Sequence, residues 1–230
     1  MTRAQDEERA VSPLRRALEA PRSSARLQAA LAAGTGPDPA YVEVLVERSA
    51  REPDFFVRDM LTWALTRHDH AEVVPMLLSE LRSAVPQARS QALHTLSKIG
   101  DPDTWQAITS ELLQDEDDEV ARAAWRAAVG TVPEDEKGAL AQTLSTQFGR
   151  GDRDVRLSLS RAFAELGPAA DPAVELAESH DDDAVRTHAI ATGRIMADPD
   201  EGFDAAIAEA RRTVALRAAP RIEDAADADR

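Results

Sequence analysis

A short arginine-containing pattern recurs six times along the chain at nearly constant spacing. In each instance a small or β-branched apolar residue, which we call the anchor, precedes arginine, directly or, in the fourth instance, with Ala121 between them, and further apolar residues follow three or four positions later. The anchors are Ala25, Val57, Ala88, Val120, Val155 and Val185, and they are 32, 31, 32, 35 and 30 residues apart. Self-similarity at a period of roughly 20–50 residues is typical of repeat architectures, in which one supersecondary unit is stacked many times.

Each anchor opens a segment whose apolar residues have helical spacing. In the fifth repeat these residues are Val155, Leu159, Ala162, Phe163 and Leu166, which lie on one face of a helix. Turns rich in Asp, Pro or Gly precede most anchors, and an aspartate there can accept hydrogen bonds from the free N–H groups of the first helical turn. Four glycines are predicted to end second helices, namely Gly34, Gly100, Gly130 and Gly167.

The segments between these helices have room for one more helix each, so the predicted unit is helix, turn, helix. The additional helices are expected at 41–51, 71–82, 104–113, 134–148 and 173–179, with a closing helix at 203–216. No stretch alternates like a half-buried strand. The predicted fold is therefore an all-α solenoid of about six helix pairs, curved and elongated, over residues 12–216. We expect residues 1–11 to form a flexible N-terminus and residues 217–230 to form an acidic, disordered tail.

Composition narrows the classes of function. The chain has no run of eighteen apolar residues and no apolar signal-peptide segment, which predicts a cytoplasmic protein that does not enter membranes. It has no cysteine, so thiolate zinc sites and thiol catalysis are excluded. The net charge of −15 disfavours nucleic acid as a partner. Arginine outnumbers lysine heavily and alanine is abundant, which is typical of a GC-rich bacterial genome.

The turn and anchor residues resemble those of HEAT repeats, in the short bacterial form related to the HEAT-like repeats of phycobilisome lyases. The resemblance is carried by Asp54-Phe55-Phe56-Val57-Arg58 and by residues 152–156 and 182–186, and it extends over about residues 12–216. It implies a ladder of turn aspartates and second-helix arginines between neighbouring repeats. Ala121 replaces arginine in the fourth repeat, and the turn of the third has no aspartate, so the ladder is expected to be interrupted there.

In solenoids of this type the second helices line the concave face. Positions two, six and nine after each anchor share one face of those helices. Across the repeats they include a row that changes from aromatic to basic, and this row is the predicted binding site: Trp63, His94, Arg122, Arg126, Arg161 and Arg194. A positive row on an acidic protein favours an acidic peptide or another anionic ligand. The alternative, that these arginines pair with neighbouring acids, remains open.

The predicted function is a non-catalytic, monomeric scaffold or adaptor that binds another protein, and a purely structural module is not distinguished from it. The family resemblance also allows an enzyme, such as a bilin lyase or an alkylpurine DNA glycosylase, for which Trp63, Asp59 and Arg126 supply matching residue types. No catalytic motif accompanies them. The clusters around His68 and His180 have too few convergent ligands for a metal, and we expect no metal and no cofactor.

Overall fold

The computed structural model describes residues 3–218 of the chain and is helical throughout. In that range it has thirteen α-helices, four short 3-10 helices and no strand. The helices pack in neighbouring pairs, which confirms the predicted α-solenoid class. The chain divides into two compact units, Met1–Val132 and Pro133–Arg230.

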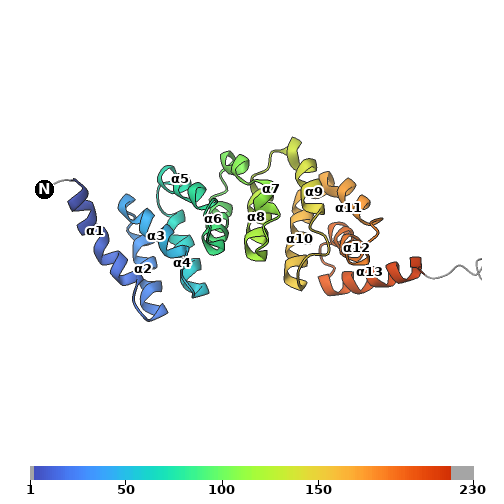
Figure 1. Ribbon diagram of the computed structural model, residues 1–230, viewed down its shortest axis with the longest axis horizontal. Helices are drawn as coiled ribbons and strands as arrows, with labels where there is room; N and C mark the ends of the chain where they lie inside the picture. Colours follow the sequence, from blue (N-terminus) through green and yellow to red (C-terminus); the bar gives the residue numbers. More distant parts are fainter. Residues whose placement is uncertain (1–2, 219–230) are drawn as a thin grey trace, which may run out of the picture. The chain divides into compact units, whose positions relative to one another are not determined.

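Unit 1 contains four helix pairs (Figure 1). Its helices are α1 (Arg3–Leu18), α2 (Ser23–Thr35), η1 (Pro39–Tyr41), α3 (Val42–Ser49), α4 (Phe55–Thr66), α5 (His70–Glu80), α6 (Pro86–Ile99), η2 (Pro102–Ala107), α7 (Ser110–Leu113) and α8 (Asp118–Thr131). The second helix of each pair packs against the second helix of the next, so α2, α4, α6 and α8 form one continuous layer. Small residues allow this close packing, as Ala64, Ala92 and Ala124 are all buried.

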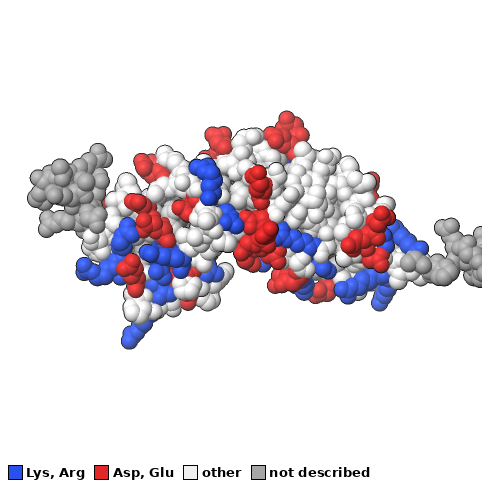
Figure 2. All heavy atoms as spheres, in the orientation of Figure 1, with Lys and Arg blue, Asp and Glu red and all other residues white. Residues whose placement is uncertain are grey.

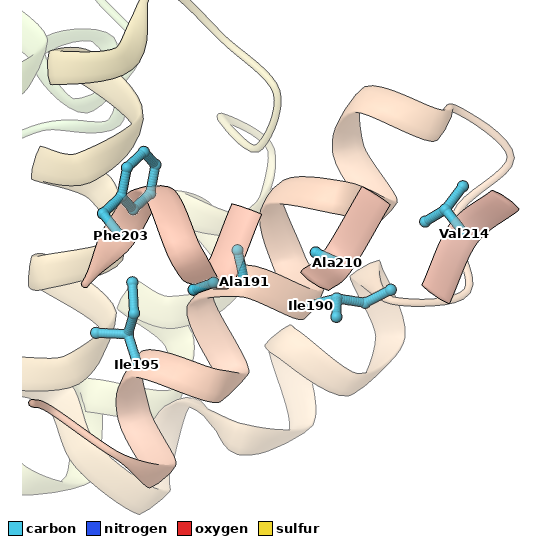
Figure 3. Close-up of a cluster of buried hydrophobic side chains, with 7 residues drawn as sticks. Ile190, Ala191, Ile195, Phe203, Ala210 and Val214 are labelled. Atoms are coloured by element: carbon cyan, nitrogen blue, oxygen red, sulfur yellow. The ribbon is translucent and has the colours of Figure 1, made fainter. Parts of the chain in front are cut away.

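Unit 2 contains two further pairs and a closing helix. Its elements are η3 (Glu134–Glu136), α9 (Lys137–Ser145), α10 (Arg153–Leu166), η4 (Gly167–Ala170), α11 (Asp171–Ala177), α12 (Asp183–Ala197) and α13 (Phe203–Ala218). Helix α13 lies where the closing helix was predicted, and Phe203, Ala210 and Val214 pack against Ile190 and its neighbours in α12 (Figure 3). The last helix therefore covers an apolar face that α12 would otherwise expose.

Aspartates cap the second helices as the sequence predicted. The side chains of Asp54, Asp117, Asp152 and Asp182 each accept at least one hydrogen bond from the first turn of the helix that follows. Their carboxylates satisfy N–H groups that have no partner within the helix. Helices α2 and α6 are the exceptions: Arg22 precedes α2 and Val85 precedes α6, and neither side chain caps its helix. At the start of α6, Pro86 has no N–H group and so needs no acceptor.

The predicted glycine stops are half correct. Gly100 and Gly167 follow α6 and α10 with φ of 68° and 65°, a conformation that favours glycine. Gly34 and Gly130 lie inside α2 and α8, so the prediction is wrong for them. At Gly34 the reason is packing, because a Cβ atom there would lie 2.4 Å from Cζ3 of Trp63. Gly34 is thus a contact surface for the tryptophan ring rather than a helix end.

Two chain segments differ from the expected boundaries. Helix α1 begins at Arg3, within the segment 1–11 that was expected to be flexible. The helix expected at 104–113 is divided into η2 and α7, because Ile108 leaves the helical region with ψ of 85°. Of the tail expected at 217–230, residues 219–230 lie outside the described residues. No helix within residues 3–218 is both long enough and apolar enough to cross a membrane.

Five of the six pattern arginines donate hydrogen bonds to carbonyl oxygens of the turn that precedes their own helix. The bonds run from Arg26 to Ala20 and Pro21, from Arg58 to Glu52 and Pro53, from Arg89 to Ser83, from Arg156 to Gly149, and from Arg186 to His180 and Asp181. Each arginine therefore closes the turn between the two helices of its own pair. In the fourth pair, where Ala121 takes the arginine position, the indole Nε1 of the buried Trp125 donates to Leu113 O at 2.8 Å instead.

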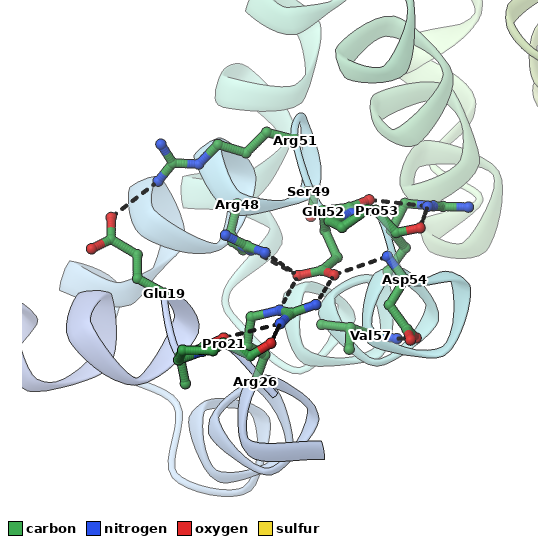
Figure 4. Close-up of polar contacts among 12 residues, drawn as sticks. Glu19, Pro21, Arg26, Arg48, Ser49, Arg51, Glu52, Pro53, Asp54 and Val57 are labelled. Carbon is green, nitrogen blue, oxygen red and sulfur yellow. Dashed lines mark hydrogen bonds and ion pairs between the residues drawn. The ribbon is translucent and has the colours of Figure 1, made fainter. Parts of the chain in front are cut away.

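Two of these arginines also pair with an acid of the following repeat. The Arg26 guanidinium donates to both carboxylate oxygens of Glu52, at 2.8 and 2.7 Å, and Arg48 bonds the same carboxylate (Figure 4). Arg89 pairs with Asp115 in the same way. Arg58 has no acid in the corresponding position, because the next turn contains Ser83, Ala84 and Val85. The cross-repeat pairs thus depend on whether each turn supplies a carboxylate.

Candidate binding site

A pocket of about 340 Å³ opens between α4, α6 and α8 of unit 1. Three consecutive second helices contribute to it, and each presents residues spaced three or four apart, which lie on one helix face. The lining residues are Phe55, Arg58 and Asp59 from α4, Ser90, Gln91 and His94 from α6, and Glu119, Arg122, Ala123 and Arg126 from α8. The pocket therefore combines three arginines with two acids and one exposed aromatic ring.

Arg126 is the cation of this pocket with the fewest protein partners. Its Nη1 lies 3.2 Å from Nδ1 of His94, and it has no carboxylate partner within the described residues. Because a guanidinium can only donate, Nδ1 of His94 is the acceptor in this contact. Burial lowers the pKa of Arg126 and the nearby charge of Arg122 lowers it further, against a smaller opposite effect of Glu119. The site therefore holds a positive charge that forms no direct ion pair with a carboxylate in the described part of the chain.

His94 is neutral in this arrangement. Burial lowers the pKa of His94, and the positive charges of Arg126 and Lys98 lower it further, against a smaller opposite effect of Asp59. The unprotonated Nδ1 is what allows Arg126 to donate to it. The two side chains are consequently coupled, and a carboxylate that arrives beside Arg126 also stabilises positive charge on His94.

The other two arginines are partly engaged with the protein. Arg122 Nη1 pairs with Glu119 at 2.8 Å, while its Nε is buried and makes no hydrogen bond within the described part of the chain. Arg58 uses Nη1 for the turn carbonyls of Glu52 and Pro53, and its guanidinium carbon lies 5.9 Å from the centre of the Phe55 ring. These two residues add positive charge near Arg126, but fewer of their N–H groups are available to a ligand.

Exposed aromatic side chains lie on the same helix of the pocket. Phe55 and Phe56, in the first turn of α4, are 65% and 71% exposed, and their rings meet edge to face at 5.6 Å. Trp63, two turns further along α4, is 38% exposed and rests on Gly34. Neighbouring apolar rings that are exposed and rimmed by polar residues are a feature of interaction surfaces.

The structure brings together part of the predicted basic row. His94, Arg122 and Arg126 line one pocket, and Trp63 lies on the same unit outside the lining. Arg161 and Arg194 belong to unit 2. Arg194 pairs with Glu201 at 2.7 Å, whereas Arg161 is exposed. The alternative interpretation, that the arginines form ion pairs with neighbouring acids, therefore holds for Arg122 and Arg194 but not for Arg126.

Sequence reasoning missed Phe55 and Arg58 as pocket residues. Both were assigned only to the repeat pattern. The available signal was the Phe55-Phe56 pair directly after the helix cap Asp54, because residues in the first turn before an anchor cannot both reach the core.

Charges of both signs are interspersed on the visible face of unit 1 (Figure 2). This face therefore does not present a continuous basic stripe of the kind that follows a phosphate backbone. Within the described residues no group of three or more His, Asp or Glu side chains is arranged to hold a metal ion.

Comparison with known proteins concerns the repeat rather than the activity. The family model described as HEAT repeats matches residues 52–130, which include α4 to α8 and the pocket. This match supports the HEAT-type repeat that the sequence indicated. No curated protein matches the chain. Among solved structures, human deoxyhypusine hydroxylase in complex with glycerol aligns with 16% identity over 92% of this chain and 96% of that chain, with a TM-score of 0.44. A likeness at that level carries no argument about function.

Proposed function

We propose that this protein is a non-catalytic HEAT-repeat scaffold that binds an acidic segment of another protein in the pocket between α4, α6 and α8. One observation carries the proposal: Arg126 stands in that pocket with a neutral imidazole, not a carboxylate, as its hydrogen-bond partner. We also propose that the protein is monomeric and cytoplasmic and that its repeats are of the short bacterial form.

A carboxylate is the ligand group that fits Arg126. The planar guanidinium offers paired N–H donors that match the two oxygens of a carboxylate, and charge-assisted bonds of this kind are among the strongest polar contacts. Burial and Arg122 both disfavour the positive charge of Arg126 in the free protein. An incoming anion would offset both effects, so part of its binding free energy would come from relieving repulsion that already exists.

The aromatic rim adds a second requirement to the segment. Phe55 lines the pocket and is mostly exposed, so a ligand that reaches Arg126 from that side passes over its ring. Burying an aromatic ring at an interface contributes apolar contact with little loss of conformational freedom. The expected ligand is therefore an acidic residue with an apolar residue close to it, rather than a run of acids alone.

Charge reversal at Arg126 tests the proposal. The probe is a fluorescein-labelled peptide in which glutamate and leucine alternate, measured by fluorescence anisotropy at physiological salt. We expect Arg126→Glu to weaken binding at least about tenfold, since a hydrogen bond to a charged group contributes roughly 1.5–3 kcal/mol. Arg161→Glu is the matched control, because it makes the same charge change on an exposed residue of unit 2.

The outcomes separate a site from a general charge effect. Equal weakening by Arg126→Glu and Arg161→Glu would mean that the peptide responds only to net charge, and the pocket would have to be abandoned. A Phe55→Ser variant that loses affinity for the alternating peptide, but not for a peptide of glutamate and serine, would support the role of the aromatic rim.

The enzymatic alternatives have less support from the described residues. Asp59, the acid that a glycosylase of this fold would need, lines the pocket and is exposed to solvent. The other acid of the pocket, Glu119, is exposed as well, so the lining has no buried carboxylate. We therefore propose neither glycosylase nor bilin lyase activity.

A further inference from the structure

The exposed ring of Trp63 lies against an apolar face of α2. A Cβ atom at Gly34 would lie 2.4 Å from Cζ3 of the ring, so the indole packs where α2 has no side chain. Leu27 and Leu31 precede Gly34 by seven and three residues, which places all three on one face of α2. Both leucines are only partly buried, and Trp63 is 38% exposed. These three large side chains, Leu27, Leu31 and Trp63, form what we call the apolar patch.

Trp63 and the pocket around Arg126 lie at the same level along neighbouring helices. Helices α4, α6 and α8 pack side by side in chain order (Figure 1). Oγ1 of Thr62, the residue before Trp63, lies 3.4 Å from Oγ1 of Thr95 on α6. His94, the residue before Thr95, in turn accepts a hydrogen bond from Arg126 on α8 at 3.2 Å. A line from Trp63 over His94 to Arg126 therefore crosses three helices of unit 1.

The width of the helices sets the distance between the two ends of this line. Trp63 lies on α4 and Arg126 on α8, and α6 packs between these two helices. Because packed helix axes are about 8–10 Å apart, the two residues are on the order of 16–20 Å apart. An extended chain advances about 3.3 Å per residue, so about five or six residues of an extended segment would cover this distance.

The two ends of the line also differ in charge. Asp59 precedes Trp63 by four residues, so it shares that face of α4, and its side chain is exposed. An acidic residue of a ligand bound beside Trp63 would be repelled by Asp59. At the other end, Arg126 has no carboxylate partner within residues 3–218 and would attract the same acid. The surface therefore favours a ligand whose acid lies apart from the residue that meets Trp63.

We propose that the acidic segment crosses α4, α6 and α8 in an extended conformation, with a large apolar side chain on the apolar patch and its acid at Arg126, about five or six residues apart. This inference rests on the proposed function, because the acid at Arg126 fixes one end of the segment. It adds a second anchor beyond the apolar residue that meets Phe55. The partner is therefore a protein that exposes an extended segment with an apolar residue and an acid at this spacing.

The test uses the full chain and peptides of identical composition. Each fluorescein-labelled peptide contains one phenylalanine, one pair of glutamates and several serines, and only the number of serines between phenylalanine and glutamate changes. The series is made in both chain directions. Because charge and composition stay constant, differences in affinity report on spacing alone. By anisotropy we expect the tightest binding with about four or five intervening serines, and binding at least about fivefold weaker with a single serine.

Variants of the protein connect the optimum to the apolar patch. Trp63→Ser should abolish the dependence on spacing, whereas Trp63→Phe, which keeps an aromatic ring against α2, should preserve it. Leu176→Ser is the matched control, because it removes an exposed apolar side chain from unit 2 and should leave the optimum unchanged.

The outcomes distinguish this inference from the proposed function. Equal affinities across the series, with Arg126→Glu still weakening every peptide, would overturn the inference and leave the proposed function standing. An optimum that persists unchanged in Trp63→Ser would also overturn it. If Arg126→Glu affects no peptide, the proposed function fails and this inference fails with it.

Discussion

At the scale of single residues, Glu52 is the most heavily used side chain of unit 1. It is fully buried, and its carboxylate receives Arg26 from α2, Arg48 from α3 and the backbone N–H of Asp54. Although burial acts in the opposite direction, these donors lower the pKa of Glu52 to about 2. One carboxylate thus joins the first two repeats.

Replacing that carboxylate should destabilise unit 1. Glu52→Gln keeps the shape but leaves Arg26 buried without a counter-charge, and breaking a buried pair in this way costs roughly 3–5 kcal/mol. The three tryptophans, at 63, 105 and 125, all lie in unit 1, so urea unfolding followed by tryptophan fluorescence reports on that unit. Glu47→Gln is the control, because Glu47 pairs with Arg15 at the surface and should cost less than about 1 kcal/mol. Similar losses in both variants would contradict the assigned role of Glu52.

Another buried residue, His188, should make the stability of unit 2 depend on pH. His188 is 1% exposed; its Nδ1 accepts from Gly149 N at 3.1 Å, and its Nε2 lies 3.0 Å from the Arg156 carbonyl oxygen. Burial lowers its pKa to about 4, with a further contribution from the charge of Arg156. Protonation at Nδ1 would place two donors face to face.

The sign of the effect follows from the lowered pKa. In the unfolded chain His188 takes up a proton near pH 6.5, but in the folded chain only near pH 4. The contribution of the neutral side chain to the free energy of unfolding is therefore complete above pH 6.5 and is lost as the pH falls from 6.5 to 4. The loss is on the order of 3 kcal/mol. Urea unfolding followed by circular dichroism at pH 7.5 and 4.5 measures it. In His188→Gln the protein starts less stable, but this part of the pH dependence should vanish; an unchanged slope would assign it to other groups.

At the scale of helices, the sequence predicted the positions of the helices better than the residues that end them. The closing helix and the aspartate caps were predicted correctly because periodicity and capping are local properties. Gly34 and Gly130 were wrongly predicted as helix ends because the sequence alone does not distinguish a glycine inside a helix from one that follows it. For Gly34 the packing neighbour explains the difference. At Gly34 that neighbour is Trp63, which is 29 residues away in the chain.

The candidate site was predictable only in part, for the same reason. Helical spacing placed His94, Arg122 and Arg126 on a common face, and the structure has them in one pocket. Which arginine remains available depends on contacts that spacing does not reveal, such as that of Arg122 with Glu119 and that of Arg194 with Glu201.

At the scale of the whole molecule, the net negative charge disfavours the binding of nucleic acid. A net charge of −15 repels a phosphate backbone over distances of about a Debye length, roughly 8 Å at physiological salt. We expect no change in the anisotropy of a fluorescein-labelled duplex containing an alkylated purine at 150 mM salt (about physiological), and no release of the base on prolonged incubation. Saturable binding that survives Arg126→Glu would overturn the exclusion of nucleic acid, and release of the base would revive the glycosylase alternative.

The arginines that close their own turns have a consequence for how such a chain can change its length. Each of these arginines bonds to carbonyl oxygens five to seven residues earlier, so the hydrogen bonds that close a turn lie within one helix pair. A whole helix pair can therefore be duplicated or deleted without separating an arginine from the carbonyl oxygens that it bonds. Only the junctions with a cross-repeat ion pair, as between Arg26 and Glu52 or Arg89 and Asp115, would need a matched acid on the incoming side.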